Sequence, residues 1–392
     1  MTKIDEPQKM HSESFFDSAQ AKKLAARNST LGKSGADKDH KSTAFVIACR
    51  WIVGNQIEWS STLLAAIYLW DSFVAGGESV MVKLQYRIPG DPQGRYTRGW
   101  NDIYYIARWV VIFTALRVIL MQWILEPFAR WYGVRSRRKV TRFGEQGWLT
   151  IYYILSNSAG LYVMHGSPYW MNTKGLWTDY PEGHKQMTAL MKSYYLIQLG
   201  FWFQQVFVIL IEEHRKDFFA MFTHHIITCN LMGWSLYMNF TRIGNAILCL
   251  MDSSDIFLSG TKCIRYLGFE RVAMGSFIVF ILSWVYTRHY LYFKLMHCII
   301  YESTTIIGFD SWDPKNGSFY SYNVVLAFGV LLALLQILII YWFALVLRVV
   351  YRVIFLSNYD DSRSDSEDGG DDDNDAADLD RKTVANKKKK SD

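Results

Sequence analysis

The segment Asn323–Leu347, NVVLAFGVLLALLQILIIYWFALVL, runs for 25 residues without a charged side chain. About 20 consecutive apolar residues allow a helix to cross the hydrocarbon core of a bilayer, so this segment predicts a transmembrane helix. Seven further segments have a similar length and apolar character. The sequence therefore predicts an all-α polytopic membrane protein with about eight spans, at 59–76, 103–125, 148–165, 190–211, 218–240, 243–262, 272–295 and 322–347.

The composition agrees with a membrane protein. Hydrophobic residues make up 51% of the 392 residues and charged residues 20%, against about 25% charged residues in an average soluble domain. This pattern argues against a cytosolic two-domain enzyme, a secreted disulfide scaffold and a nucleic-acid-binding protein. The five cysteines include no Cys-x-x-Cys pair, so we expect free thiols that behave as small buried hydrophobic residues.

Four regions differ in composition along the chain. Residues 1–44 are predicted to be a polar cytosolic tail without a signal peptide. Residues 45–94 hold the first span, an interfacial helix within 43–57 and a lumenal loop. Residues 95–355 form the main helical membrane domain. Residues 356–392 are predicted to be a disordered tail that is first acidic and then basic.

The tail 356–392 also carries two regulatory patterns. Its serines precede acidic residues, which suits an acidophilic kinase, and a solubilising tail is the alternative; the candidate phosphorylation sites are Ser362, Ser364 and Ser366. Lys389 and Lys390 occupy the fourth and third positions from the end. This spacing matches the dilysine signal that retrieves membrane proteins to the endoplasmic reticulum, an address read by a receptor, and a generic basic tail is the alternative.

Basic residues in the short loops predict the orientation in the membrane. The loop 126–147 holds six Lys and Arg residues, and the turns 212–217 and 263–271 add two each. We therefore expect these connections and both termini in the cytosol, although the loop 77–102 has four basic residues and opposes the trend. With this topology, Asn316 is the only one of three Asn-x-Ser/Thr sequons placed for glycosylation.

Ionisable side chains within membrane spans are costly and usually functional. At 1.5 Å per residue, the histidine pair, Asp255 and Arg117 lie about 9–12 Å from the cytosolic ends of their spans. We therefore expect them at one level, with Asp252 one turn deeper and Arg288 near the lumenal end. The full set is Arg117, His224, His225, Asp252, Asp255, Arg288 and His289.

This set of groups suits acyl transfer. A neutral imidazole can take a proton from a nucleophile or attack a thioester itself, and a neighbouring carboxylate can orient the ring. Adjacent histidines on a helix point about 100° apart, so one is expected to act and the other to assist. The alternatives are packing histidines, an ion pair between the aspartates and Arg117, and a zinc site, which adjacent histidines cannot easily form.

Several motifs around this set resemble ceramide synthases, the longevity-assurance proteins of the TLC-domain superfamily, of the fungal type. The resemblance covers roughly residues 95–355. The segments that carry it are GFWFQQ at 200–205, RKDF at 215–218, HHIIT at 224–228, NFTRIG at 239–244, MDSSDIFLS at 251–259, WVYTRH at 284–289 and Tyr341-Trp342.

The resemblance implies an enzyme of the endoplasmic reticulum that acylates the amine of dihydrosphingosine or phytosphingosine with a long or very long acyl chain from acyl-CoA. It implies no cofactor and no metal. In that family His224, His225, Asp252 and Asp255 correspond to residues required for activity, and 95–355 is the TLC domain, a bundle around a lipid cavity. It also implies membrane lipids, a small single-span accessory subunit and a homo- or hetero-oligomer as partners, and no nucleic acid.

The expected substrate-binding residues follow from this chemistry. CoA phosphates are anionic, which suits basic residues at the cytosolic ends of the spans; the candidates for CoA or lipid binding are Arg117, Arg138, Lys139, Arg215, Lys216, Trp284 and Arg288. Alternative functions are a lipid sensor of the same superfamily, a proton-coupled lipid transporter and a ceramidase-like hydrolase. The paired histidines and D-x-x-D motif favour the transferase, and we find no internal repeat of the transporter kind.

Overall fold

The computed structural model describes residues 47–212, 217–308 and 310–355. The chain divides into two units, Met1–Asn55 and Gln56–Asp392, and the described part of the first unit contains a short helix over 47–54. The predictions at Arg215, Lys216, the three tail serines and the two tail lysines lie outside the described residues.

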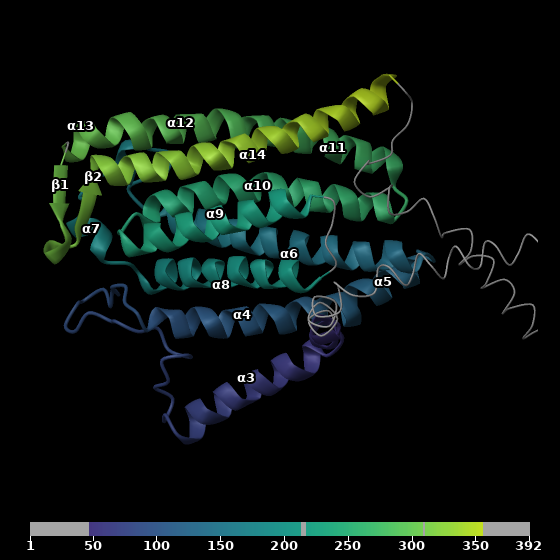
Figure 1. The fold of residues 1–392 in the computed structure, drawn as a ribbon, viewed down its shortest axis with the longest axis horizontal. Helices are drawn as coiled ribbons and strands as arrows, with labels where there is room; N and C mark the ends of the chain where they lie inside the picture. The colour runs from purple at the N-terminus through teal and green to yellow at the C-terminus, as the bar shows by residue number, and fades with distance from the viewer. Residues whose placement is uncertain (1–46, 213–216, 309, 356–392) are drawn as a thin grey trace, which may run out of the picture. The chain divides into compact units, whose positions relative to one another are not determined.

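Each predicted span coincides with a helix of the second unit (Figure 1). Among the described residues, four helical stretches are long and apolar enough to cross a membrane, namely Asp102–Tyr132, Ala189–Ile211, Glu270–Ile307 and Tyr322–Arg352. The remaining helices contain more polar residues. The long helices are α3 (Gln56–Phe73), α4 (Asp102–Ile119), α6 (Arg137–His165), α8 (Ala189–Ile211), α9 (Phe218–Tyr237), α10 (Thr241–Tyr266), α11 (Glu270–Trp284) and α14 (Tyr322–Phe355).

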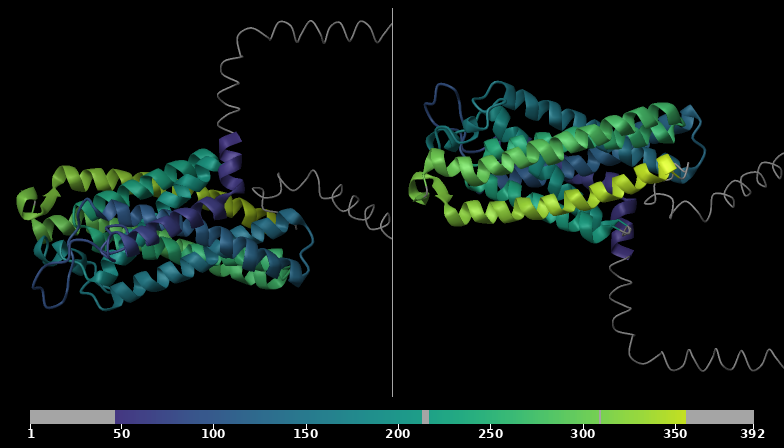
Figure 2. Two further views of the ribbon diagram at one scale, coloured as in Figure 1. Left: turned by 90° about the horizontal axis from the view of Figure 1, so that it is seen from below. Right: turned by 90° about the horizontal axis from the view of Figure 1, so that it is seen from above.

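Apart from α3, which crosses at an angle, these helices lie side by side along one direction, and α10 is central (Figures 1 and 2). It packs against α6, α9 and α11, while α8 packs between α4 and α9, and α3 packs on α4. Small residues permit the close approach of α6 and α10. A Cβ atom at Gly160, for example, would overlap the Tyr194 hydroxyl and the Cys249 sulfur.

Three wider π-helical turns interrupt the long helices. η1 (Leu120–Leu125) joins α4 to α5 (Glu126–Tyr132). The seventh predicted span, 272–295, ended too early, because the helix continues to Ile307. Its parts are α11, η3 (Val285–Leu291), α12 (Tyr292–His297), η4 (Cys298–Glu302) and α13 (Ser303–Ile307). Such π turns are rare and often mark functional sites, and η3 carries Arg288.

Short elements close the end of the bundle at which α9 turns into α10. A hairpin of β1 (Asp310–Asp313) and β2 (Ser318–Ser321) precedes α14, a small strand pair that an all-α prediction did not include. The other short elements are η2 (Lys174–Leu176), α7 (Glu182–Lys185) and η5 (Pro314–Asn316). Asn316 is exposed in the hairpin turn, and its amide donates to Asp313 Oδ2 at 2.7 Å.

Hydrogen bonds of Asn239 connect the segments at this end of the bundle. The residue is buried with a positive φ of 64°, a conformation that asparagine tolerates better than most residues. Its side chain accepts from Arg98 Nε at 3.0 Å and donates to the Gly317 carbonyl at 2.9 Å. These contacts connect the 77–102 loop, the turn between α9 and α10, and the hairpin.

Candidate active site

A cavity of about 630 Å³ runs inside the bundle, with walls from α6, α8, α9, α10, α11 and α14. Because α9 and α10 are antiparallel, the start of α9 and the end of α10 lie together at one end of it. That end, which we call the mouth, is lined by Arg117, Arg142, Glu212, Lys262 and Arg265. The opposite end, which we call the floor, is lined by Trp177, Tyr195 and Phe240.

The histidine pair lines the cavity between mouth and floor. His225 is buried, and its Nδ1 lies 2.7 Å from the Met221 carbonyl oxygen. Because a carbonyl can only accept, Nδ1 carries the proton and Nε2 of the neutral ring has the lone pair. The ring of His224 lies between Trp202 and Trp342, with centroid distances of 5.5 and 5.2 Å.

The two histidines differ in their hydrogen bonds. His224 makes none within the described part of the chain, and its Nδ1 is buried. His224 also lies within electrostatic range of Arg288. The ring of His225 is therefore fixed by a hydrogen bond, whereas the ring of His224 is held only by packing in the cavity wall.

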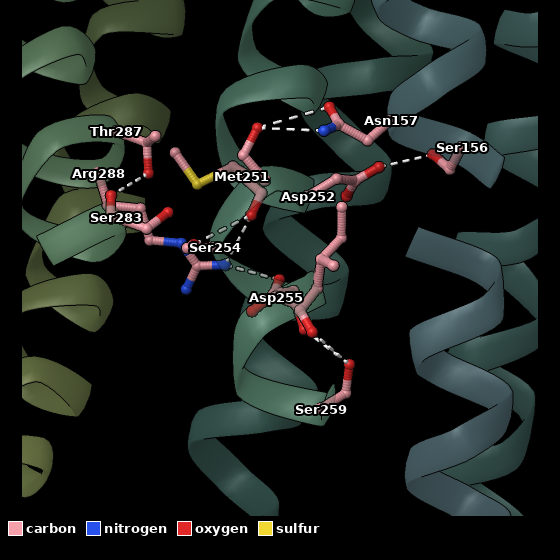
Figure 3. Close-up of polar contacts among 12 residues, drawn as sticks. Ser156, Asn157, Met251, Asp252, Ser254, Asp255, Ser259, Ser283, Thr287 and Arg288 are labelled. Atoms are coloured by element: carbon pink, nitrogen blue, oxygen red, sulfur yellow. Dashed lines mark hydrogen bonds and ion pairs between the residues drawn. The ribbon is translucent and has the colours of Figure 1, made fainter. Parts of the chain in front are cut away.

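Asp255 pairs with Arg288 across the cavity wall (Figure 3). Arg288 Nη2 lies 2.6 Å from Asp255 Oδ2 and donates to the Met251 carbonyl at 3.0 Å. The guanidinium carbon lies 4.1 Å from the centroid of the Trp284 ring, a favourable cation–π distance. The prediction that Arg288 lies near the far end of its span was wrong, because the helix continues to Ile307 and Arg288 lies near its middle.

Asp252 points away from the cavity toward α6 (Figure 3), and it does not line the cavity. Ser156 Oγ donates to Asp252 Oδ2 at 2.6 Å, and Gln198 Nε2 lies 3.5 Å from the same oxygen. Gln198 also bonds to Ser156 and to the hydroxyl of Tyr152. The two aspartates of the D-x-x-D motif thus have different partners, Ser156 for Asp252 and Arg288 for Asp255. Within the described residues neither aspartate hydrogen-bonds to a histidine.

Arg117 was expected at the level of Asp255, and the structure corrects this. Arg117 Nη2 lies 2.6 Å from Glu212 Oε1, and both side chains line the mouth. The alternative of an ion pair between Arg117 and an aspartate of α10 is therefore wrong. The cation that pairs with Asp255 is Arg288.

Of the predicted basic residues, Arg117 lines the mouth, but others do not. Arg138 and Lys139 are exposed near the start of α6 and do not line the cavity. Arg142 lines it and pairs with Glu145 at 3.0 Å, while Lys262 and Arg265 reach it from α10. The spacing of Lys262 and Arg265, three residues apart on one helix face, was a signal that could have identified them.

The metal alternative finds no support. Within the described ranges, no group of three or more His, Cys, Asp and Glu side chains is arranged to bind an ion. His289 lies apart from the cavity wall, where its Nδ1 accepts from Gln336 Nε2 at 3.0 Å. The titratable groups of the site thus include His224, His225, Asp255 and Arg288, with Asp252 behind them.

A bundle of apolar helices around an internal cavity, with ionisable groups part-way along it, is typical of a membrane protein whose functional site lies within the bundle. The TLC domain of TRAM, LAG1 and CLN8 proteins matches residues 142–348. Sphingosine N-acyltransferase lag1 of Schizosaccharomyces pombe is 44% identical over 276 residues, 70% of each chain. Ceramide synthase LAG1 of Saccharomyces cerevisiae is 34% identical over 298 residues, 74% of this chain and 69% of the relative.

Sphingosine N-acyltransferase lac1 of Schizosaccharomyces pombe is 38% identical over 290 residues, 73% of this chain and 74% of the relative. The chain therefore belongs to the ceramide synthases, the sphingosine N-acyltransferases of the TLC-domain family. The resemblance seen in the sequence motifs is confirmed.

Proposed function

We propose that this chain transfers a long or very long fatty acyl group from acyl-CoA to the amine of a sphingoid base, and that the cavity is its active site. The observation that carries the proposal is the order of chemistry along the cavity. Positive side chains lie at the mouth, imidazoles lie half-way, and apolar walls lead to the floor. An acyl-CoA has the same order, with anionic phosphates, a reactive thioester and an apolar chain.

His224 is the reacting group in this proposal, because its ring lines the cavity and makes no hydrogen bond within the described protein. His225 orients the pair through its bond to Met221. Asp255 pairs with Arg288 and so offsets the positive charge that would otherwise oppose the charge developing on His224. Asp252 is a positioning residue that fixes α10 against α6 and α8.

His224 can act in two ways, and both conserve atoms and protons. As a general base, it takes the proton of the amine while the amine nitrogen attacks the thioester carbonyl, and it returns that proton to the departing CoA sulfur. As a nucleophile, it forms an acyl-imidazole and releases CoA as the thiol, and the amine then displaces the imidazole. Both routes form one amide bond and break one thioester bond.

The mouth is the proposed site of the CoA phosphates. Lys262, Arg265 and Arg142, the last of which is paired with Glu145, bring positive charge to it, and basic side chains bind phosphate oxygens strongly. Arg117 is held by Glu212 at the same end. Arg215 and Lys216, which follow Glu212 in the sequence, are proposed to add to this charge, and Trp284 supports Arg288.

The membrane setting is proposed on the sequence patterns. We infer about eight spans, with the mouth and both termini in the cytosol, where CoA is available. Residues 95–355 would form the TLC domain around a lipid-filled cavity, flanked by the tail 1–44, the first-span region 45–94 and the tail 356–392. The endoplasmic reticulum is supported by the dilysine pattern at Lys389 and Lys390. The exposed Asn316 would be its lumenal glycosylation site.

Two further features complete the proposal. Phosphorylation of Ser362, Ser364 and Ser366 would deepen the negative charge of the tail. A small single-span accessory subunit and a homo- or hetero-oligomer are the proposed partners, together with membrane lipids. No cofactor is needed, because the acyl-CoA thioester is already activated.

The test is acyl transfer by the purified protein with a labelled sphingoid base and acyl-CoAs of several lengths. We expect wild type to form ceramide, and His224→Ala and Asp255→Asn to lose activity while they remain folded. His297→Ala is the matched control, because that imidazole is 63% exposed and lies outside the cavity. An inactive wild type, in membranes that contain the accessory subunit, would overturn the proposal and favour lipid sensing or transport.

A further inference from the structure

Tyr153 contributes a side chain from α6 to the cavity wall. Its hydroxyl makes no hydrogen bond within the described residues. Tyr152, its neighbour in sequence, is buried and donates to Gln198 outside the cavity. Adjacent helical residues point about 100° apart, so α6 presents one tyrosine to the polar network of Asp252 and the other to the cavity.

The surroundings of Tyr153 place it at the reaction centre. The residues of α6 on either side of it meet α10 at Cys263 and Ser253, through Thr150 and Asn157 respectively. Tyr153 therefore lies between these contacts, near the level of Asp255, whose charge acts on its hydroxyl together with the charges of Asp252 and Arg288. The cavity wall at this level therefore combines an imidazole, an ion pair and an unpartnered phenol. A polar hydroxyl in a largely apolar cavity is costly unless a ligand completes its hydrogen bond.

We propose that Tyr153 is a further catalytic residue, which donates its phenolic O–H to the carbonyl oxygen of the acyl group. This inference rests on the proposed acyl transfer at His224. When nitrogen attacks the carbonyl carbon, the C=O double bond opens and its electron pair moves to the oxygen. A hydrogen bond to that oxyanion is stronger than one to the neutral carbonyl, so it stabilises the transition state more than the bound substrate.

The other polar groups at this level have different tasks. Arg288 Nη2 is already engaged by Asp255 and by the Met251 carbonyl. His224 handles the amine proton or carries the acyl group, and the Asp255 carboxylate would repel an oxyanion. Tyr153 retains its proton throughout, because collapse of the intermediate re-forms C=O as the C–S bond breaks and the CoA sulfur takes its proton from His224.

The experiment compares Tyr153→Phe with wild type under saturating acyl-CoA and sphingoid base. Loss of one oxyanion donor lowers kcat by about 100-fold or more in enzymes that use such donors, so we expect a loss of that order with similar KM values and an unchanged melting temperature. Tyr162→Phe is the matched control, because that tyrosine lies on α6 with 74% exposure. Activity of Tyr153→Phe within a factor of about two of wild type would overturn the inference.

A second variant separates catalysis from packing. Replacement of Tyr153 by 3-fluorotyrosine keeps the ring and makes the phenol a stronger donor, so kcat is expected to match or exceed that of wild type. An unchanged kcat with a raised KM for the sphingoid base, in Tyr153→Phe, would instead assign the hydroxyl to binding that base and refute the oxyanion role. Wild-type activity with unmodified substrates tests the proposed function separately, so the two failures are distinguishable.

Discussion

Arg288 Nη2 and Asp255 Oδ2 lie 2.6 Å apart and join η3 to α10 beside the histidine pair. Both side chains are largely buried, with 7% and 19% exposure. In such a setting the ion pair contributes little net stability, but removal of one partner leaves an uncompensated charge. The pair therefore makes the geometry of the site sensitive to either residue.

Asp255→Asn leaves Arg288 buried without its counter-ion, and breaking a buried pair in this way costs about 3–5 kcal/mol. We expect a clear fall in the melting temperature together with loss of acyl transfer. Asp255→Asn combined with Arg288→Gln removes both charges, so stability recovers while activity does not. Recovery of activity in the double variant would contradict a role for the pair in the reaction.

Asp252→Asn should be milder than Asp255→Asn, because the amide oxygen that this substitution introduces can still accept from Ser156. One perturbed hydrogen bond is worth about 1 kcal/mol, which corresponds to a loss of activity of about tenfold or less. Ser156→Ala, which removes the donor at 2.6 Å, should have an effect of similar size. Steady-state acyl transfer with both variants checks this. Complete inactivation of both Asp252→Asn and Asp255→Asn would refute the proposal that the two aspartates have different roles.

The helices and the histidine pair could be predicted because both depend on local sequence. Apolar runs have the length of a membrane span, and ionisable residues stand out within them. The depth of Arg288 could not be predicted in this way, because the polar residues after Leu295 conceal the continuation of the helix to Ile307. The π turn η3 further changes where the Arg288 side chain points.

The different neighbours of Asp252 and Asp255 also could not be predicted from the sequence. Residues three apart on a helix differ in direction by about 60°, which is enough for one to face α6 and the other to face η3. Which neighbour lies on each side is decided by packing. Packing also explains why Arg138 and Lys139 are exposed whereas Arg142 lines the mouth.

The mouth residues should affect acyl-CoA more than the sphingoid base. Lys262→Gln and Arg265→Gln each remove a positive charge near the proposed phosphate site, and a charge-assisted hydrogen bond is worth about 1.5–3 kcal/mol. We expect KM for acyl-CoA to rise by about tenfold or more, with a smaller effect at high salt. Lys139→Gln is the control, since that side chain is exposed away from the cavity. Equal changes in KM for both substrates would argue against a phosphate site.

His184 predicts a pH dependence of stability. The residue is buried in α7, and burial, together with the nearby Arg242 guanidinium, lowers its pKa from 6.5 to about 4. The unfolded chain therefore binds more protons than the folded chain between these values, so the stabilising contribution is complete above pH 6.5 and is lost as the pH falls toward 4.

At 1.36 kcal/mol per pKa unit, protonation of His184 lowers the free energy of unfolding by about 3 kcal/mol. Melting temperatures of detergent-purified protein between pH 7 and pH 4 measure it. His184→Gln, which cannot titrate, should have a flatter profile than wild type over this range, and parallel profiles for the two proteins would show that other groups dominate.

Acyl-CoA alone can distinguish the two proposed roles of His224. If the imidazole carries the acyl group, incubation without a sphingoid base should release one equivalent of CoA and leave an acyl group on the α9 peptide, detectable by mass spectrometry. His225→Gln should retain a reduced burst, because its ring orients the pair through Met221, whereas His224→Gln should have none. CoA release that requires the sphingoid base would instead establish a ternary complex, with His224 as general base.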